Sequence, residues 1–344
     1  MLGKLKSVGN SVAKQAKSGA AKARSKATKN EDQYIVALDI GTEFVKALLA
    51  KVNAEDSTVE IVGVGRAHQA LSDMQAGAIA DIAGVVDNCD KALNQAEDQA
   101  RVSVRTAIIG IAGELVKGTT TTVRVARKDV TKPLDIVEME KIINLVQDRA
   151  ETKAKTQLAW ELGGKEVEVR LVNSALVSIE IDGYPVTNPI GFQGKDVVVQ
   201  LYTAFAPLIH IGALEKTAQE LDLDLLAVAA EPFAVSRAVI GNNPNQNLSA
   251  ILMDVGGGTT DIAVIHEGGV QGTKMFGIGG RAYTHAIERD LSVEFPEAEE
   301  LKIGLSTNKA PVQQRPAVEA ALAKTADVWI GGIELALSEF TKLD

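Results

Sequence analysis

From residue 34 onward, hydrophobic residues occur in short runs that are separated by turn formers. The runs "YIVALDIG", "FVKALLAKV" and "VEIVGVGRAH" predict three strands, of which the first two form a hairpin. Residues 80–100 have helical spacing, and "TAIIGIAG" (residues 106–113) predicts a buried strand. The apolar face of that helix would carry Ile82, Val85, Val86, Cys89 and Leu93.

The pattern of predicted elements changes between residues 116 and 198. Short strands alternate there with one clear helix that starts near Pro133, a residue well tolerated at the start of a helix. A turn is expected at Asp182 and Gly183, and a long strand follows in "VVVQLYTAFAP". We interpret this segment as a small α+β domain inserted into a larger α/β domain.

The remaining pattern repeats the beginning of the chain. A helix at residues 208–220 leads to a strand and helix in "LLAVAAEPFAVSRAVIG", and then to the polar cluster "NNPNQN". The stretch "ILMDVGGGTTDIAVIHEGG" predicts a second hairpin. It is followed by a helix near residues 281–291, the segment "PEAEELKIG" and a helix at about 318–340. The order of elements predicts an α/β protein with an internal duplication.

The two predicted hairpins share a plan in their turns. Asp39 and Asp254 each end an apolar strand and are followed by one residue, a glycine and a threonine. Glycine leaves backbone N–H groups accessible to an anion, and carboxylates can hold Mg²⁺ beside phosphates. A single Asp-x-Gly turn is usually only a hairpin. Two copies, one of them as rich as GGGTTD, favour a nucleotide held between the hairpins.

The sequence resembles the actin-like ATPases from residue 34 to near its end. "LDIGTEFVK" looks like the first phosphate motif of that superfamily, "MDVGGGTTD" like the second, and "AAEPFAVSRAV" like the connecting helix. "GIGGRAYTHAI" and "AEELK" are similar to the segments that close on the nucleoside. The resemblance implies a duplicated, ribonuclease H-like α/β fold that binds ATP with Mg²⁺.

The resemblance also implies roles for individual residues. Asp39 and Asp254 would hold the metal, and Glu231, Asp254 and Asp261 would serve hydrolysis by positioning the attacking water. The expected contacts to the phosphates and the nucleoside are Asp39, Gly41, Thr42, Lys46, Gly256, Gly257, Gly258, Thr259, Thr260, Gly279, Gly280, Glu299 and Lys302. Alternatives are a helix cap for Glu231, an exposed helix pair for Glu299 and Lys302, and a solvated strand residue for Lys46. Hydrolysis would be slow, if the nucleotide is hydrolysed at all.

The position of the insert favours one branch of the superfamily. It lies between "IIGIAG" and "VVVQLYTAF", as in FtsA of bacterial cell division, whose Asp-Gly and Pro-x-Gly pattern is similar to "DGYPVTNPIGFQGKDVVV". The implied domains are a basic tail (1–33), subdomain 1A (34–115 and 199–245), an SHS2-like insert (116–198) and a second lobe (246–344). The implied function is self-association and linkage of a division polymer such as FtsZ to the membrane.

Two other functions stay open within the superfamily. A PilM-like adaptor would recruit an inner-membrane protein of the type IV pilus, and a small-molecule kinase would need an acceptor pocket for which we find no motif. The family's last glycine pair, which packs on adenine, is not found after Phe340, and Gly331 and Gly332 lie within a helical pattern. The family's C-terminal membrane helix is not found either. We therefore expect a truncated chain or a reduced variant.

Charge and composition limit the classes of binding partner that we expect. The net charge is −9, which argues against nucleic acid as a partner. Residues 1–30 nevertheless contain lysines, one arginine and no acid. Either this segment is a solvated tail or it is a basic amphipathic contact to an anionic membrane. A weak apolar stripe is formed by Leu2, Leu5, Val8 and Val12.

The expected location is the cytoplasm, with peripheral contact at the inner face of the membrane through the basic tail. Cys89 is the only cysteine, which fits a reducing compartment. The sequence has no apolar run of the roughly 20 residues that cross a bilayer.

Overall fold

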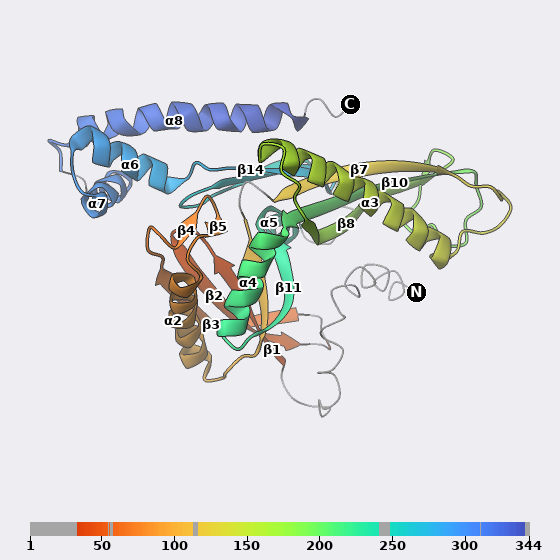
Figure 1. Cartoon of the computed structure of the whole chain (residues 1–344), viewed down its shortest axis with the longest axis horizontal. Coiled ribbons are helices and arrows are strands. Elements are labelled where there is room, and N and C mark those ends of the chain that lie inside the picture. Colours follow the sequence, from red (N-terminus) through yellow and green to blue (C-terminus); the bar gives the residue numbers. More distant parts are fainter. Residues whose placement is uncertain are drawn as a thin grey trace.

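We describe the protein from a computed structural model, which places residues 33–340 with gaps at 54, 56–57, 113–115, 241–247 and 310. The predicted basic tail lies outside these residues, apart from Gln33, where the first strand begins. Figure 1 shows one sheet with its helices below an elongated upper part that carries a long C-terminal helix. In the described ranges, no helix is both long and apolar enough to cross a membrane.

The five-stranded sheet has the order β11-β6-β1-β2-β3. The predicted hairpin is present, with β1 (Gln33–Ile40) antiparallel to β2 (Phe44–Asn53), and β3 (Thr58–His68) continues the meander. β6 (Thr106–Ile111) lies parallel to β1, and β11 (Asp224–Ala230) lies parallel to β6. Alternate residues of β1 and β2 are buried, because successive side chains of a strand point to opposite faces. These core residues are Val36, Leu38, Ile40, Val45, Ala47 and Leu49.

Helix α2 (Ile82–Ala100) covers the buried face of this sheet, as the apolar spacing predicted. The short strands β4 (Met74–Gln75) and β5 (Ala78–Ile79) precede it as a separate hairpin. Asp81 fixes the start of α2, because its side chain accepts a hydrogen bond of 3.0 Å from the Ala83 amide. Cys89 is fully buried in α2, and burial raises the pKa of its thiol to about 12.

The segment predicted as an insert contains three long antiparallel strands, one short strand and one helix. In chain order its elements are β7 (Lys117–Ala126), α3 (Ile136–Glu161), β8 (Val169–Ile181), the short β9 (Tyr184–Pro185) and β10 (Asp196–Pro207). The helix begins three residues after Pro133, because Asp135 caps it by accepting from the Glu138 amide at 2.8 Å. The boundary expected at residue 198 falls inside β10, so residues 199–207 lie in a strand of the insert.

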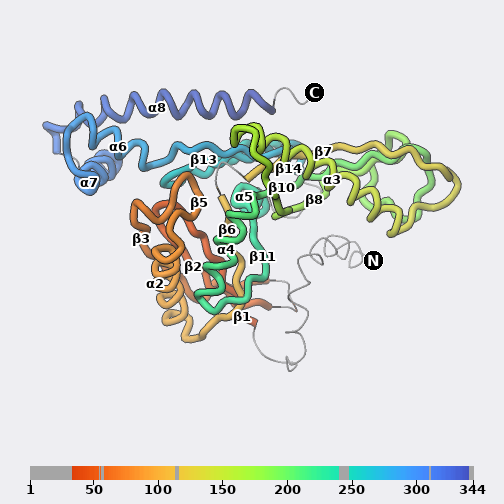
Figure 2. The backbone as a smooth tube through the Cα atoms, in the orientation of Figure 1, coloured from red at the N-terminus to blue at the C-terminus, as the bar shows by residue number. Residues whose placement is uncertain are grey.

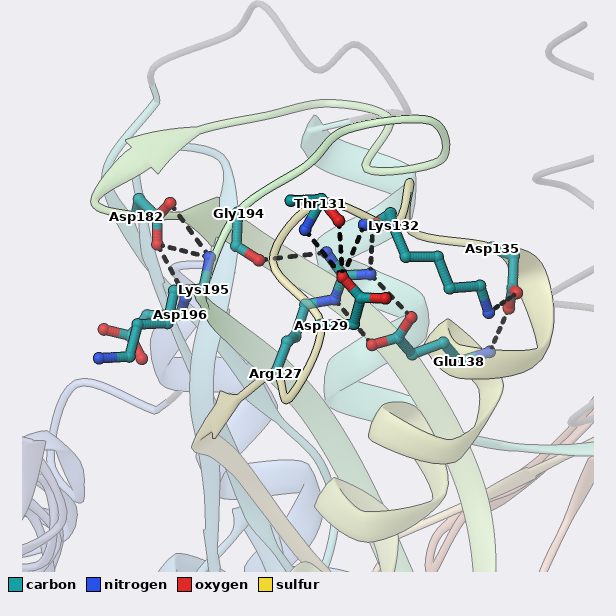
Figure 3. A network of polar contacts seen from close by, with 10 residues as sticks. All are labelled: Arg127, Asp129, Thr131, Lys132, Asp135, Glu138, Asp182, Gly194, Lys195 and Asp196. Atoms are coloured by element: carbon teal, nitrogen blue, oxygen red, sulfur yellow. Dashed lines mark hydrogen bonds and ion pairs between the residues drawn. The ribbon is translucent and has the colours of Figure 1, made fainter.

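A buried arginine holds the loops at one end of the insert (Figure 3). Arg127 donates from Nε and Nη2 to the two carboxylate oxygens of Glu138, at 2.7 and 3.0 Å. It also donates to the carbonyls of Gly194 and Lys132, at 3.1 and 2.8 Å. The hydrogen bonds from Arg127 hold the pKa of Glu138 below its usual range. A buried guanidinium with this many acceptors fixes the loop before α3 and the loop between β9 and β10 in one arrangement.

The second hairpin joins the sheet of the insert and does not form a sheet of its own. β12 (Ala250–Val255), β13 (Thr260–His266) and β14 (Gly269–Phe276) extend it to the order β12-β13-β14-β7-β10-β8-β9. β14 pairs with β7 through Gly272 with Thr119 and Thr273 with Gly118. A Cβ at Gly118 would lie 2.0 Å from Thr273 Oγ1, so the close pairing needs glycine there.

The remaining helices connect and cover these sheets. α4 (Leu208–Glu220) has the predicted bounds, and α5 (Glu231–Ile240) follows β11. α6 (Gly280–Leu291), α7 (Phe295–Ser306) and α8 (Arg315–Ser338) form a small core of their own. The chain trace in Figure 2 shows α8 passing above β13 and β14 after α6 and α7 have reversed the chain.

The packing of α2 on β3 leads to a stability prediction. A Cβ at Gly65 would lie 1.7 Å from the Ala92 carbonyl oxygen, and one at Gly63 would lie 2.1 Å from that of Ala96. We expect Gly65→Ala to lower the free energy of unfolding by about 1–3 kcal/mol, because backbone of α2 must move. Urea denaturation measures this change.

A glycine in α4 supplies the matched control. At Gly212, no described atom outside the helix's own nearby backbone lies within 4 Å of an added Cβ. Gly212→Ala should therefore raise stability by about 0.5–1 kcal/mol, because alanine is the better helix former. Equal effects of the two substitutions would show that α2 does not pack on β3 in this way.

Candidate functional site

The two hairpin turns have matching geometry. The Gly41 amide donates to the Phe44 carbonyl at 3.1 Å, and the Gly256 amide donates to the Thr259 carbonyl at 2.9 Å. In the first hairpin Asp39 pairs across the strands with Lys46, and in the second Asp254 pairs with Asp261. The repeat predicted from sequence thus holds at the level of register, with a lysine in one copy where the other has an aspartate.

The turns lie in direct contact with each other. A Cβ at Gly257 would lie 2.7 Å from Glu43 Cβ, and a Cβ at Gly258 would lie 2.7 Å from Thr42 Oγ1. Neither distance leaves room for a side chain, so both positions need glycine for this approach. In the structure the glycine turn is filled by the first hairpin, at the place where we expected phosphate.

Helix α6 begins on the same glycine turn. The amides of Gly280 and Arg281 donate to the carbonyls of Gly256 and Gly257, at 2.9 and 2.8 Å. These bonds satisfy two of the amides that a helix start leaves without partners inside the helix. A Cβ at Gly279 would lie 2.5 Å from the Gly256 carbonyl oxygen, so Gly279 also allows a close backbone contact.

Four carboxylates and one lysine meet beside these turns. Lys46 Nζ lies 2.8 Å from Asp39 Oδ2, and this hydrogen bond raises the pKa of Lys46. Burial, followed by the charges of Asp39, Asp261 and Asp254, raises the pKa of Glu231 well above its usual value. Glu231 begins α5 and lies against Gly110, where a Cβ would be 2.9 Å from its Oε1. The site therefore concentrates negative charge on the residues that the sequence pointed to.

Asp261 is the buried member of this group. Burial raises its pKa to about 7, although the hydroxyl of Thr259, which donates to Oδ2 at 3.1 Å, acts in the opposite direction. Its Oδ1 is buried and has no hydrogen-bond partner in the described part of the chain. A buried acceptor without a donor is unfavourable, so a cation or a donor nearby would stabilise it.

The site's residues fit Mg²⁺ only together with further ligands. Among residues 33–340, outside the gaps, no three His, Cys, Asp or Glu side chains are grouped closely enough to hold a metal. Asp39 comes from the first hairpin and Asp254 from the second. Mg²⁺ usually keeps several waters and takes one or two protein carboxylates plus phosphate oxygens, which matches such a pair.

The predicted nucleoside contacts are brought to α6 and bind one another there. Lys302 Nζ lies 2.6 Å from Glu299 Oε2 and donates to Thr284 Oγ1 at 2.8 Å and to the Gly280 carbonyl at 3.1 Å. The Thr284 hydroxyl also bonds to Glu299. These side chains are largely buried between α6 and α7, so they are more than an exposed helix pair.

Sequence reasoning missed three residues at the junction of the turns. Glu43 Oε2 accepts from Arg281 Nε at 2.7 Å, and Glu43 Oε1 lies 2.7 Å from His68 Nε2. Arg281 directly follows the quoted pair Gly279 and Gly280, which was the available signal. Glu43 lies within the quoted motif "LDIGTEFVK", next to Thr42. His68 gave no signal, because its contact joins segments far apart in the sequence.

Two further features lie outside the predicted site. Gly332, within α8, packs on Phe276, since a Cβ there would lie 2.9 Å from the ring. A pocket between α3, β7 and β14 is lined in part by Lys117, Lys153 and Lys274, and contains none of the predicted nucleotide contacts.

The raised pKa of Asp261 gives a prediction with a defined sign. Its folded-state value of about 7 exceeds the ordinary 3.8, so ionising the buried carboxyl destabilises the fold as the pH rises between these values. Asp261→Asn should therefore raise the melting temperature at pH 8 in EDTA. The corresponding gain in the free energy of unfolding has an upper bound of about 4 kcal/mol. The gain should shrink towards pH 4.

Asp98, exposed on α2, provides the control. Asp98→Asn should leave the melting temperature unchanged at both pH values, because an exposed carboxylate keeps its water. If Asp261→Asn melts at the wild-type temperature at pH 8, the carboxyl of Asp261 is not buried as described.

Three comparisons with known proteins agree with this architecture. The family described as cell division protein FtsA matches residues 251–324. The chain is 26% identical over 272 residues to the cell division protein FtsA of Pseudomonas aeruginosa, covering 79% of this chain and 60% of that protein. For the FtsA of Neisseria meningitidis serogroup B the identity is 27% over 281 residues, covering 79% and 61%.

A solved structure matches over most of the chain. The PilM-PilN type IV pilus biogenesis complex gives a TM-score of 0.62 at 15% identity, covering 91% of this chain and 78% of the matched one. At this identity the likeness shows the fold, which is a mixed α/β actin-like ATPase fold. The chain spans about three fifths of the length of the two FtsA proteins that it matches. On sequence and fold together, the chain is similar to FtsA proteins at about 26% identity and has a mixed α/β actin-like ATPase fold.

Proposed function

We propose that the protein binds ATP with Mg²⁺ between its two hairpins. The observation that carries the proposal is the meeting of two Asp-x-Gly turns from different sheets beside four carboxylates and Lys46. Asp39 and Asp254 would hold the metal, which would neutralise phosphate charge when bound. Other amides of the turns and the hydroxyl of Thr42 would supply donors for phosphate oxygens. The hydroxyls of Thr259 and Thr260 donate to Asp261 and to the Ile278 carbonyl in the structure, so they would have to turn to reach phosphate.

Hydrolysis, if it occurs, would depend on positioning and charge. A carboxylate with a raised pKa is a better base, so Asp261, with a pKa of about 7, is suited to take a proton from an attacking water. Glu231 lies beside it on α5 and would orient that water. Lys46, bound to Asp39 in the structure, would move to the phosphate. Glu299, Lys302 and the start of α6 at Gly279 and Gly280 would hold the nucleoside.

Substituting the second-hairpin aspartate tests nucleotide binding. We expect Asp254→Ala to weaken Mg²⁺-dependent ATP binding about 10- to 100-fold, the usual range for residues that support a metal. Asp254 is exposed, so the fold should persist. Isothermal titration calorimetry with ATP and Mg²⁺ measures the change, and circular dichroism checks the fold.

The exposed Asp98 again provides the matched control. Asp98→Ala should bind ATP as the wild type does. An Asp254→Ala protein that is folded and keeps the wild-type affinity would contradict the assignment of the site.

At the level of the cell, we propose an FtsA-like role. The protein would self-associate through its insert, which we assign to residues 116–198 as an SHS2-like interaction domain, and link a division polymer such as FtsZ to the membrane. The chain would act in the cytoplasm. The basic residues 1–30 would supply peripheral membrane contact, each Lys or Arg contributing about 1 kcal/mol near an anionic surface.

A vesicle experiment tests this role. We expect the full chain at low salt to sediment FtsZ polymers with vesicles that contain anionic lipid. A chain beginning at Glu31 should leave the polymers in the supernatant, because it lacks the basic segment. Raised salt should release the full chain, since the attraction is largely coulombic.

The PilM-like alternative is supported by the fold match to the PilM-PilN complex. It predicts no recruitment of FtsZ polymers and instead retention of the chain by a short peptide from a pilus inner-membrane protein. Retention by that peptide without FtsZ recruitment would replace the FtsA-like role.

A further inference from the structure

Glu43 occupies an unusual position for a turn residue. Its carboxylate joins the first hairpin to α6 through Arg281 and also contacts His68 at the end of β3. The side chains of Glu43 and Arg281 are only 20% and 11% exposed. The ion pair is therefore shielded from water much more than an ordinary surface pair, which strengthens it.

This contact uses only part of the hydrogen-bonding capacity of the Arg281 guanidinium. Its Nε donates to Glu43, but its Nη2 is buried and finds no acceptor among the residues that the structure places. A guanidinium carries five N–H donors in a fork that suits the two oxygens of a carboxylate or of a phosphate. Arg281 thus keeps a free donor for a second or a replacing anion.

The contact between the turns excludes such an anion from between them. Gly257 and Gly258 lie directly on Glu43 and Thr42, too close even for a methyl group. A phosphate between the two hairpins needs several ångströms more. It can enter only if the turns separate, and their separation breaks the bond between Glu43 and Arg281.

We propose that Glu43 is an internal substitute for phosphate, which holds the two hairpins closed until the phosphates of a nucleotide replace it on Arg281. The inference rests on the proposed ATP site and adds its regulation and a further phosphate-binding residue. Opening and anion binding are linked, because the apparent affinity for the nucleotide equals the intrinsic affinity multiplied by the fraction of molecules that are open. Breaking the latch formed by Glu43 and Arg281 therefore strengthens binding, as long as Arg281 is present.

The first measurement is independent of nucleotide. Hydrogen exchange of the Gly257 and Gly258 amides reports on the closed state, because Glu43 and Thr42 of the first hairpin lie directly on these two glycines. Glu43→Gln keeps the size of the side chain and removes its charge, so these amides should exchange faster than in the wild type. Glu60→Gln, at an exposed position on β3, is the control and should leave the exchange unchanged.

The second measurement is ATP affinity in the presence of Mg²⁺. We expect Glu43→Gln to lower the Kd roughly tenfold, the effect of one charge-assisted hydrogen bond. Arg281→Gln should also speed exchange but should raise the Kd, since it removes the receiving guanidinium. The double variant should bind no more tightly than Arg281→Gln alone.

Each outcome decides between the two proposals. Unchanged exchange in Glu43→Gln overturns the latch, whether or not ATP binds. Faster exchange with an unchanged Kd overturns the replacement of Glu43 by phosphate. Faster exchange in the absence of ATP binding by any variant, wild type included, supports the closed contact and overturns the proposed function instead.

Discussion

The contact between the glycine turn of the second hairpin and the turn of the first hairpin is the constraint on which the rest of this structure depends. The β12–β13 turn can lie against the β1–β2 turn only because positions 257 and 258 are glycine. The same turn accepts the first amides of α6, so its position also sets where that helix begins. The carboxylates at the ends of both strand pairs are brought together as a result.

This arrangement has an electrostatic consequence. Burial and the charges of Asp39 and Asp254 raise the pKa values of Glu231 and Asp261, and Lys46 is the positive charge that lowers the pKa of Glu231. Such clusters are unfavourable for folding unless a counter-ion or a ligand balances them. The group is therefore better explained by binding of a cation than by stability, and in the structure protein groups satisfy part of that demand.

Residues 116–198 contribute to the sheet and to the core of the rest of the protein. β14 pairs with β7, and Tyr202 on β10 is fully buried against Thr273 on β14, with their hydroxyl oxygens 3.3 Å apart. The core of the five-stranded sheet continues into residues of β10, β13 and β14. Removing residues 116–198 would take away the strand that pairs with the second hairpin, so this segment has a structural role in the fold. Arg127 keeps its loops ordered far from that junction.

The sequence by itself determined the local elements and the repeated motif. Alternation of apolar residues predicted the β1–β2 hairpin, helical spacing predicted α2, and paired Asp-x-Gly turns predicted which carboxylates would meet. These are short-range signals, since a strand or a helix face repeats every two or every three to four residues. Tertiary structure alone decided that β14 pairs with β7 and that Glu43 binds Arg281. Such contacts join residues distant in sequence and depend on how closely two backbones approach, which no local pattern records.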